Sequence, residues 1–342
     1  MPSPLVAGPP LEVPRFAVGR SSTELVDPAR GDRRVPVDVW FPASGTAGAL
    51  SGYEILPGVG FTASATSDAA IAAGPHPAVL WSHGRTGTRS SYVLLCEALA
   101  ARGFVVVAPE HTGDALGDWI TGAAVDDETN EANRIGDAHF VLDALLDNPG
   151  SLAPIAAAVD PTRIAAAGHS YGGFTALSLG SGNARHAAVR AVAGMQSFTR
   201  TMPKQVFVEM EVPTLLAVGA RDATTPPETD ADRAWAKLGA PSAWRVDVAR
   251  AGHQACSDVG LYVELAPHVE GVPDLVRAFV ASMAADITGT AGDPWRPTVA
   301  LHAQLLGAFL EGALGIDAIG ATNQFAAIGE VLGVTVDARG GF

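Results

Sequence analysis

The chain has 342 residues, of which 48% are hydrophobic and 17% are charged, so it is apolar enough to bury a large core and is not a disordered chain. Its net charge of −14 and its 22 scattered lysines and arginines argue against a nucleic-acid-binding surface, which needs clustered positive charge. The two cysteines cannot form a disulfide framework: we expect Cys96 to be a core thiol, and the pairing of Cys256 stays open.

The N-terminal part, residues 1–33, is rich in proline, glycine and charge, and we expect it to lead into the domain along its surface as an extension. It lacks a basic segment followed by an apolar core, so no secretion signal is predicted. A cytoplasmic protein is therefore expected, or a secreted one if a leader has been removed. No membrane span is expected either, because the most apolar later stretch, 299–316, is interrupted by His302, Gln304 and Glu311.

Apolar strands and helical patterns alternate along the rest of the chain. A strand near the edge of the sheet is predicted at 35–41, followed by a long loop over 42–76. Buried strands are predicted at 78–82, 104–108, 164–167, 188–193 and 213–220, and a strand with one solvated face at 244–248. Helices are predicted at about 92–102 with a Gly103 cap, 135–147, 272–286 and 297–315, and a polar loop that carries Trp119 is predicted at about 109–128.

This alternation predicts an α/β fold: one domain at 34–290 with a mostly parallel sheet covered by helices on both faces. Only about twenty residues separate the strands at 188–193 and 213–220, so no large cap domain is expected and the site should be open. A C-terminal helical extension, 291–342, is expected to pack on the same domain. A homodimer contact through these C-terminal helices is the alternative interpretation.

A serine motif, Gly168-His169-Ser170-Tyr171-Gly172, follows one of the predicted buried strands and precedes a small-residue helical pattern. A serine in a strand-to-helix turn projects its hydroxyl away from the sheet, and the flanking glycines tolerate the crowding there. The pentapeptide alone is a weak signal in a chain with 38 glycines. Its position after a strand, with an acid and a histidine downstream, indicates that Ser170 is a nucleophile.

A serine hydroxyl needs a base within hydrogen-bond reach and a third group to orient that base. Asp222 lies two residues beyond the strand at 213–220, and His253 follows the strand at 244–248. Both positions are at the carboxyl edge of the sheet, where the active-site loops of open α/β folds gather. The order Ser, Asp, His is the one associated with this type of turn.

The rival side chains fit less well. Glu228 and Asp230 fall at the start of the following helix, so Asp222 is the predicted acid. Among the histidines, His169 adjoins the serine but is expected to point away from it, and His83 and His111 lie on loops with no acid partner in order. His253 is therefore the predicted base.

Acyl transfer also needs hydrogen-bond donors for the developing oxyanion. The predicted pair is the main-chain N–H of Tyr171, immediately after the serine, and that of Arg85, in the glycine-bearing turn after the strand at 78–82. The side chain of Arg85 is not needed for this role. Trp119 and Tyr171 are candidates for the lining of the substrate pocket, with simple packing as the alternative.

Four stretches, 81–92, 104–114, 168–176 and 251–258, together carry a resemblance to a known superfamily. Over roughly residues 33–285 the chain resembles the α/β-hydrolases. More narrowly, it is similar to the branch that holds platelet-activating-factor acetylhydrolase-like esterases, dienelactone-hydrolase-type proteins and bacterial polyester hydrolases.

This resemblance implies Ser170 as nucleophile, Asp222 as acid, His253 as base, and the N–H groups of Arg85 and Tyr171 as oxyanion donors, in agreement with the residue-level prediction. Dienelactone hydrolases proper use a cysteine where Ser170 stands. The residue at the position of Arg85 is often apolar or aromatic in these relatives, so its positive charge predicts an acidic or polar substrate.

The sequence thus predicts a serine hydrolase that cleaves a small-molecule or polymeric carboxylic ester through an acyl-enzyme. A peptidase or amidase on the same residues, and a non-catalytic ligand-binding protein on a hydrolase fold, are the alternatives. No metal or cofactor is expected, because His-x-x-x-His and Cys-x-x-Cys spacings are absent from the sequence.

Overall fold

The computed structural model describes residues 14–56, 59–147, 150–265, 268, 274–290 and 292–342. Within them, eleven strands form one sheet in the order β11-β10-β9-β8-β7-β5-β6-β2-β1-β4-β3. The six strands from β10 to β6 in this order are parallel, and antiparallel pairs flank them at both ends. The strands are β1 (Ala17–Asp27), β2 (Arg33–Ala43), β3 (Leu50–Leu56), β4 (Val59–Ser67), β5 (His76–Ser82), β6 (Val105–Pro109), β7 (Val159–His169), β8 (Val189–Met195), β9 (Thr214–Gly219), β10 (Ala243–Val248) and β11 (Val334–Arg339).

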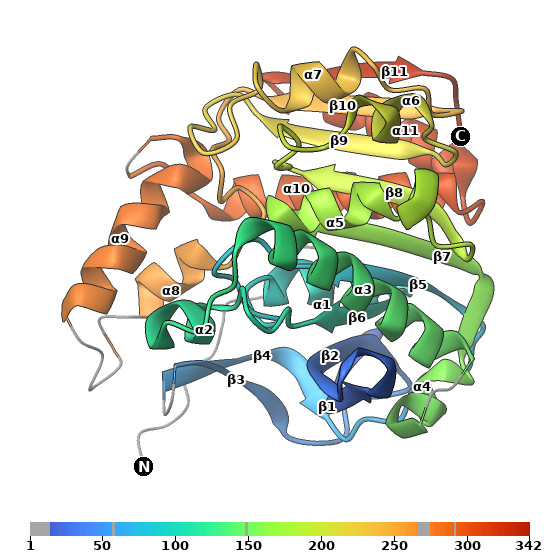
Figure 1. Ribbon diagram of the computed structural model, residues 1–342, viewed down its shortest axis with the longest axis vertical. Helices are drawn as coiled ribbons and strands as arrows, with labels where there is room; N and C mark the ends of the chain where they lie inside the picture. Colours follow the sequence, from blue (N-terminus) through green and yellow to red (C-terminus); the bar gives the residue numbers. More distant parts are fainter. Residues whose placement is uncertain (1–13, 57–58, 148–149, 266–267, 269–273, 291) are drawn as a thin grey trace.

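Helices cover both faces of this sheet, as Figure 1 shows, with α3 and α5 in front of it and α1 and α10 behind. Each face has its own large cluster of buried apolar side chains, because the central parallel strands are buried on both sides. The helices are α1 (Val93–Arg102), α2 (Leu116–Thr121), α3 (Asp127–Leu146), α4 (Ala153–Ala156), α5 (Tyr171–Ser178), α6 (Lys204–Val208), α7 (Ala231–Trp235), α8 (Val259–Leu265), α9 (Asp274–Thr288), α10 (Arg296–Ala313) and α11 (Ala318–Gly329), with short 3₁₀ turns at Pro28–Arg30, Gly150–Leu152 and Gly182–Ala184.

The six parallel strands lie where the apolar runs predicted them. Helix α1 also ends as predicted, since Gly103 has a φ of +115° and donates its N–H to the Ala100 carbonyl oxygen at 3.0 Å. In β10 the side chains of Trp244, Val246 and Val248 are buried while Arg245 between them is only half-buried, which is the predicted solvated face. Only helix α6 lies between β8 and β9, so the expected absence of a large cap at that point holds.

The N-terminal half of the sheet differs from the prediction. The predicted surface extension 1–33 contains β1, which pairs with β2 along its whole length, while residues 1–13 lie outside the described residues. Strand β2 is consequently an interior strand between β6 and β1, not an edge strand. The polar and charged residues of β1 hide its strand character, because most of its side chains are exposed or only half-buried and give no continuous apolar pattern.

Two further segments predicted as irregular are also regular structure. The predicted loop over 42–76 contains β3 and β4, which bury Tyr53 and Phe61 among many small side chains. The polar loop expected at about 109–128 contains α2 and the start of α3, whose N-terminus is capped by the Asp126 carboxylate. Short alternating runs of serine, threonine, alanine and glycine give only a weak period-two signal.

The C-terminal segment contributes a helix and a strand to the same sheet structure. Helix α10 buries Leu305, Leu306 and Phe309 against strands of the domain, and β11 adds an antiparallel edge strand beside β10. This strand lies in the Gly-rich end for which no element was predicted. Because the apolar surface of α10 is covered within the chain, it requires no second copy of the protein. The predicted start of the preceding helix, residues 272–273, lies outside the described residues.

Candidate active site

Ser170 occupies a strained turn between β7 and α5. Its φ is +56° and its ψ is −118°, a backbone conformation that residues other than glycine rarely adopt. A Cβ on Gly168 would overlap the carbonyl group of Gly172, and a Cβ on Gly172 would overlap the carbonyl oxygen of Ser82. Both glycines are therefore required by close backbone packing, and this packing holds the serine at the carboxyl edge of the sheet.

Asp222 and His253 meet beyond the ends of β9 and β10. The Nδ1 of His253 lies 2.9 Å from Oδ2 of Asp222, and both side chains are buried. A carboxylate can only accept, so Nδ1 carries the proton and Nε2 keeps a free lone pair. The imidazole is thus in the tautomer that a general base needs.

The carboxyl group of Asp222 is held in its ionised form. Burial favours the neutral acid, but hydrogen bonds from His253 and Thr225 outweigh burial and keep the pKa of Asp222 below its usual value. Thr225 donates both its backbone N–H, at 2.8 Å, and its hydroxyl, at 2.6 Å. The backbone N–H of Thr224 adds a third donor at 2.8 Å.

Ser170 and His253 line the same cavity, which has a volume of about 510 Å³. Within the described part of the chain the Ser170 hydroxyl has no hydrogen-bond partner, so its Oγ makes no hydrogen bond to Nε2 of His253. Such contacts are commonly long in free enzymes and shorten when substrate binds.

The rival acid and histidines have other partners. Asp230 accepts the backbone N–H of Thr199 at 2.7 Å and pairs with Arg200 at 2.5 Å, away from His253. His111 does have an acid partner, contrary to the sequence-based expectation. Its Nδ1 lies 3.1 Å from Asp137, although that acid comes from helix α3 and not from a loop after a strand.

The turn after β5 lies directly against the serine. A Cβ on Gly84 would be 3.2 Å from the Cβ of Ser170. The next N–H, that of Arg85, makes no hydrogen bond to any described residue. Tyr171 is the first residue of α5, so its N–H has no acceptor within the helix. The structure therefore leaves the two predicted donors unpaired beside Ser170.

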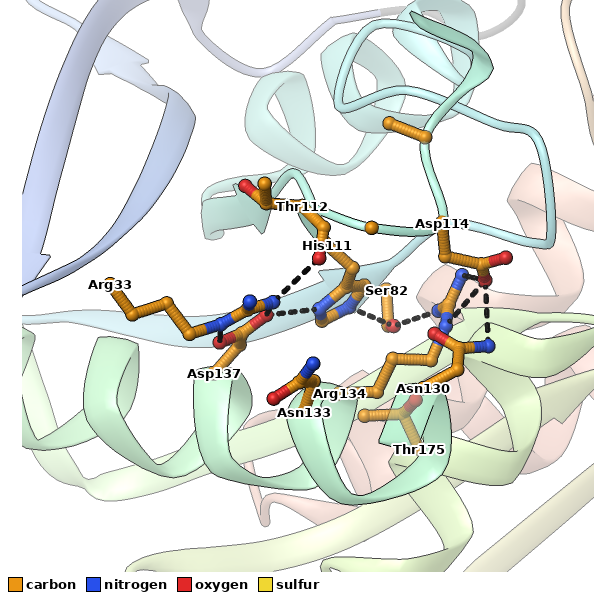
Figure 2. A network of polar contacts seen from close by, with 12 residues as sticks. Arg33, Ser82, His111, Thr112, Asp114, Asn130, Asn133, Arg134, Asp137 and Thr175 are labelled. Atoms are coloured by element: carbon orange, nitrogen blue, oxygen red, sulfur yellow. Dashed lines mark hydrogen bonds and ion pairs between the residues drawn. The ribbon is translucent and has the colours of Figure 1, made fainter. Parts of the chain in front are cut away.

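A buried arginine on α3, Arg134, contacts this turn, and Figure 2 shows its further contacts with Ser82 and Asp114. Arg134 is completely buried, and its NH1 donates to the carbonyl oxygen of His83 at 2.7 Å. Its Nε and NH2 donate to Asp114 at 2.9 and 2.6 Å, and Asn130 donates to the same carboxylate oxygen at 3.0 Å. Asp114 also accepts the indole N–H of Trp119 at 3.2 Å, so it joins the turn to a wall of the cavity.

Figure 2 also shows a second contact set of serine, histidine and aspartate. Ser82 Oγ lies 2.8 Å from His111 Nε2, and Asp137 in turn accepts from Arg33 at 2.7 Å. Burial lowers the pKa of His111 to about 4, so the imidazole is neutral. Ser82 is completely buried and no ester carbonyl can reach it, which makes this set a structural link between β5, the loop after β6 and α3.

The walls of the cavity are mostly apolar. They include residues of α2, α8 and α9 in addition to the loops that carry the serine and histidine. The apolar and aromatic members are Tyr92, Leu116, Trp119, Ile120, Val259, Tyr262, Val280 and Met283. The predicted pocket residue Trp119 is thus in the lining, with 44% of its surface exposed. The contributions of α8 and α9 were not predicted, because their helices carry no chemical motif.

The charge of Arg85 is compensated within the protein. Its guanidinium is 2.5 Å from Asp127 and 3.4 Å from Asp114, and it lies over the ring of Tyr171 at 4.4 Å and that of Trp119 at 5.5 Å. A guanidinium that already has two carboxylate partners has little attraction left for an acidic substrate. These contacts argue against the acidic or polar substrate that the charge alone suggested.

Sequence reasoning overlooked Arg134, Asp114, Tyr92 and His169 as parts of the site. One signal was available: Asn130, Arg134 and Asp137 fall on the buried face of α3, at spacings of four and three residues. Polar side chains on the apolar face of a helix indicate a buried network. The links of Tyr92 and His169 depend on long-range contacts and have no local signal.

The other expectations can be compared briefly with the structure. Cys96 and Cys256 are both buried and unpaired. In the described ranges, no group of three or more His, Cys, Asp or Glu side chains is arranged to hold a metal ion. None of the described helices combines the length and the apolar character needed to cross a bilayer.

Two comparisons with known proteins bear on this site. Residues 49–263 match the PET hydrolase-like family. The structure is similar to that of a ferulic acid esterase from Streptomyces cinnamoneus, with a TM-score of 0.72, 26% sequence identity, and coverage of 92% of this chain and 94% of that chain.

Proposed function

The chain belongs to the PET hydrolase-like family and is a carboxylic-ester hydrolase, and from this premise we propose that it cleaves its substrate through an acyl-enzyme formed on Ser170. The family and the esterase neighbour agree with the predicted α/β-hydrolase fold and with the predicted branch of esterases. One observation carries the proposal. The strained Ser170 shares a cavity with His253, whose Nδ1 is bonded to the buried carboxylate of Asp222.

The first chemical step follows from this arrangement. When an ester carbonyl occupies the cavity, Nε2 of His253 takes the hydroxyl proton as Ser170 Oγ attacks the carbonyl carbon. The Asp222 carboxylate stabilises the imidazolium that forms and keeps the ring oriented. The N–H groups of Arg85 and Tyr171 donate to the oxyanion of the tetrahedral intermediate, where the negative charge develops.

The remaining steps use the same groups. The imidazolium gives its proton to the leaving alcohol, and the acyl group stays on Ser170. A water molecule, deprotonated by His253, then attacks the acyl carbon. The bond from that carbon to Ser170 Oγ breaks, the imidazolium returns its proton to Oγ, and the acid is released. No further group is needed for the proton balance, because each proton taken by the histidine is returned within the same half-reaction.

The cavity supports an ester with a neutral, apolar or aromatic acyl group. Its walls are apolar, Trp119 presents an exposed ring, and the charge of Arg85 is already paired with carboxylates. The similar ferulic acid esterase, by its name, acts on an aromatic acid ester, which agrees with this proposal. A neutral nitrophenyl butyrate is expected to have a higher kcat/KM than the acidic nitrophenyl hemisuccinate, and the reverse order would contradict this substrate class.

The nucleophile is tested by Ser170→Ala. Turnover of nitrophenyl butyrate should fall by about four orders of magnitude or more, because the members of such a triad act as a unit. Ser181→Ala is a matched control, since Ser181 is also a buried serine but lies outside the cavity lining formed by the described residues. An alanine variant at 170 that keeps more than about a tenth of the activity would contradict the proposal.

A further inference from the structure

A chain of buried hydrogen bonds runs along the wall of the cavity, from the turn that carries Gly84 and Arg85 (the oxyanion turn) to the loop of His253. Its two side chains, Tyr92 and His169, both belong to the cavity lining. The backbone N–H of Gly84 lies 3.2 Å from the hydroxyl of Tyr92. The same hydroxyl is 2.7 Å from Nδ1 of His169, and Nε2 of His169 is 2.6 Å from the carbonyl oxygen of His253. Three separate loops of the site are therefore joined by two side chains.

The direction of every bond in this chain is determined. The carbonyl oxygen of His253 can only accept, so Nε2 of His169 carries the proton and Nδ1 is an acceptor. The Tyr92 hydroxyl must then donate to Nδ1, and its oxygen accepts the N–H of Gly84. Each of the two side chains donates one hydrogen bond and accepts one, so a change at either leaves a buried donor or acceptor without a partner.

Burial keeps this chain in one protonation state. Tyr92 and His169 are 3% and 2% exposed. Burial, aided by the neighbouring His253, lowers the pKa of His169 to about 3, and burial raises the pKa of Tyr92 above its usual value. Both groups are therefore neutral at neutral pH, and the hydrogen bonds they make to each other, to Gly84 and to His253 occupy the atoms that could exchange a proton.

The chain also explains which N–H is left for the oxyanion. Because the N–H of Gly84 is used by Tyr92, the next one, on Arg85, is the donor that remains free in the turn. His169 lies against the base, with a distance of 4.6 Å between the centres of its ring and that of His253. A shift of either side chain would thus displace a donor and the base relative to Ser170.

We infer that Tyr92 and His169 are positioning residues, which hold the oxyanion turn and the loop of His253 at a set distance across the nucleophile. This inference rests on the proposed function, since it assigns the oxyanion role to the turn. It concerns how the site is kept aligned and adds no new reacting group.

The test begins with Tyr92→Phe, which removes one oxygen atom and keeps the ring. We expect kcat on nitrophenyl butyrate to fall about tenfold, because loss of alignment by a fraction of an ångström weakens transition-state stabilisation. KM should change less than about twofold, since phenylalanine keeps the ring that Tyr92 contributes to the cavity lining.

Tyr53→Phe is the matched control. Tyr53 is 1% exposed, and its hydroxyl accepts from Trp40 at 2.8 Å and donates to Glu97 at 2.7 Å. Its phenylalanine variant therefore loses one accepted and one donated hydrogen bond, as Tyr92→Phe does. It lies on β3, outside the cavity lining formed by the described residues. Its variant should lose stability but keep kcat, whereas a general effect of destabilisation would lower kcat in both variants.

His169→Gln tests the other half of the chain. A glutamine amide can still donate near the position of Nε2, but it has no ring nitrogen to accept from Tyr92. Its kcat should fall by a factor similar to that of Tyr92→Phe, and the double variant should fall no further than the worse single variant. This variant also carries the test if Tyr92→Phe does not fold.

Inhibitor binding separates failure of the inference from failure of the proposed function. A trifluoromethyl ketone adds to the serine and forms an oxyanion, whereas the matching methyl ketone stays planar. Wild-type protein that binds both equally would overturn the proposed function itself. If the wild type prefers the trifluoromethyl ketone, Tyr92→Phe should reduce that preference about tenfold. If Tyr92→Phe keeps the wild-type preference for the trifluoromethyl ketone and has the same kcat as Tyr53→Phe, the inference is overturned while the proposed function stands.

Discussion

At Asp222, burial and hydrogen bonding have opposite effects on the pKa of the carboxyl group, and the effect of the hydrogen bonds is larger. Burial alone would raise the pKa of this carboxyl group, but the donors from His253, Thr224 and Thr225 lower it. The carboxylate thus stays charged where it can orient the imidazole. Asp230, only eight positions later in the sequence, is committed to Thr199 and Arg200. The role of an acid is therefore decided by its neighbours in space.

Asp222→Asn tests this assignment. The amide can hold the ring of His253 in the wrong tautomer, so kcat should fall by about three to four orders of magnitude with little change in fold. Asp230→Asn is the control, because it removes a buried carboxylate of the same loop region without touching the imidazole. Comparable losses of kcat in both variants, measured on one nitrophenyl ester, would speak against Asp222 as the orienting acid.

Among the elements, α10 contains a buried histidine whose contribution to the stability of the fold depends on pH. His302 is completely buried, its Nδ1 donates to the Thr298 carbonyl at 2.7 Å, and its Nε2 lies 3.0 Å from the amide nitrogen of Gln196. These bonds require the neutral ring, and burial lowers its pKa from 6.5 to about 4. The unfolded chain takes up a proton below about pH 6.5 and the folded chain does not, so this stabilisation is lost as the pH falls.

His302→Gln should remove that pH dependence. Between pH 7 and pH 5 the contribution of His302 to the free energy of unfolding should fall by about 2 kcal/mol, at about 1.4 kcal/mol per pH unit below 6.5. The wild type should thus lose about that much more stability than the variant, as measured by urea unfolding at the two pH values. The other buried histidines are common to both proteins and cancel. An equal loss in the two would contradict the assignment.

The elements that sequence reasoning found and missed differ in one physical respect. The central parallel strands, such as β7 and β9, are continuous apolar runs because both of their faces are buried. Strands β1, β3, β4 and β11 lie outside that central region and carry small, polar or charged residues in place of a continuous apolar run. Their place in the sheet is set by pairing with neighbours, which a local pattern does not contain.

For the whole molecule, the parallel strands bring loops that are distant in sequence to one edge of the sheet. Ser170, Asp222 and His253 each follow a strand, and the serine motif together with the order of the predicted strands placed them at one edge of the sheet. Asp222 and His253 are hydrogen-bonded there, and Ser170 and His253 line one cavity. The supports behind them were not predictable in this way. Tyr92, at the N-cap of α1, and Arg134, in α3, lie on opposite faces of the sheet. Both contact the oxyanion turn, and only the packed structure reveals this.

The most direct test of the account is covalent labelling with a fluorophosphonate, followed by mass spectrometry of the intact chain and its peptides. The wild type should gain one adduct per chain, located on Ser170, and Ser170→Ala should gain none at the same exposure. His253→Ala should be labelled far more slowly, because the hydroxyl has lost its base. An adduct on another residue, or equal labelling of the wild type and Ser170→Ala, would contradict a nucleophile at this turn.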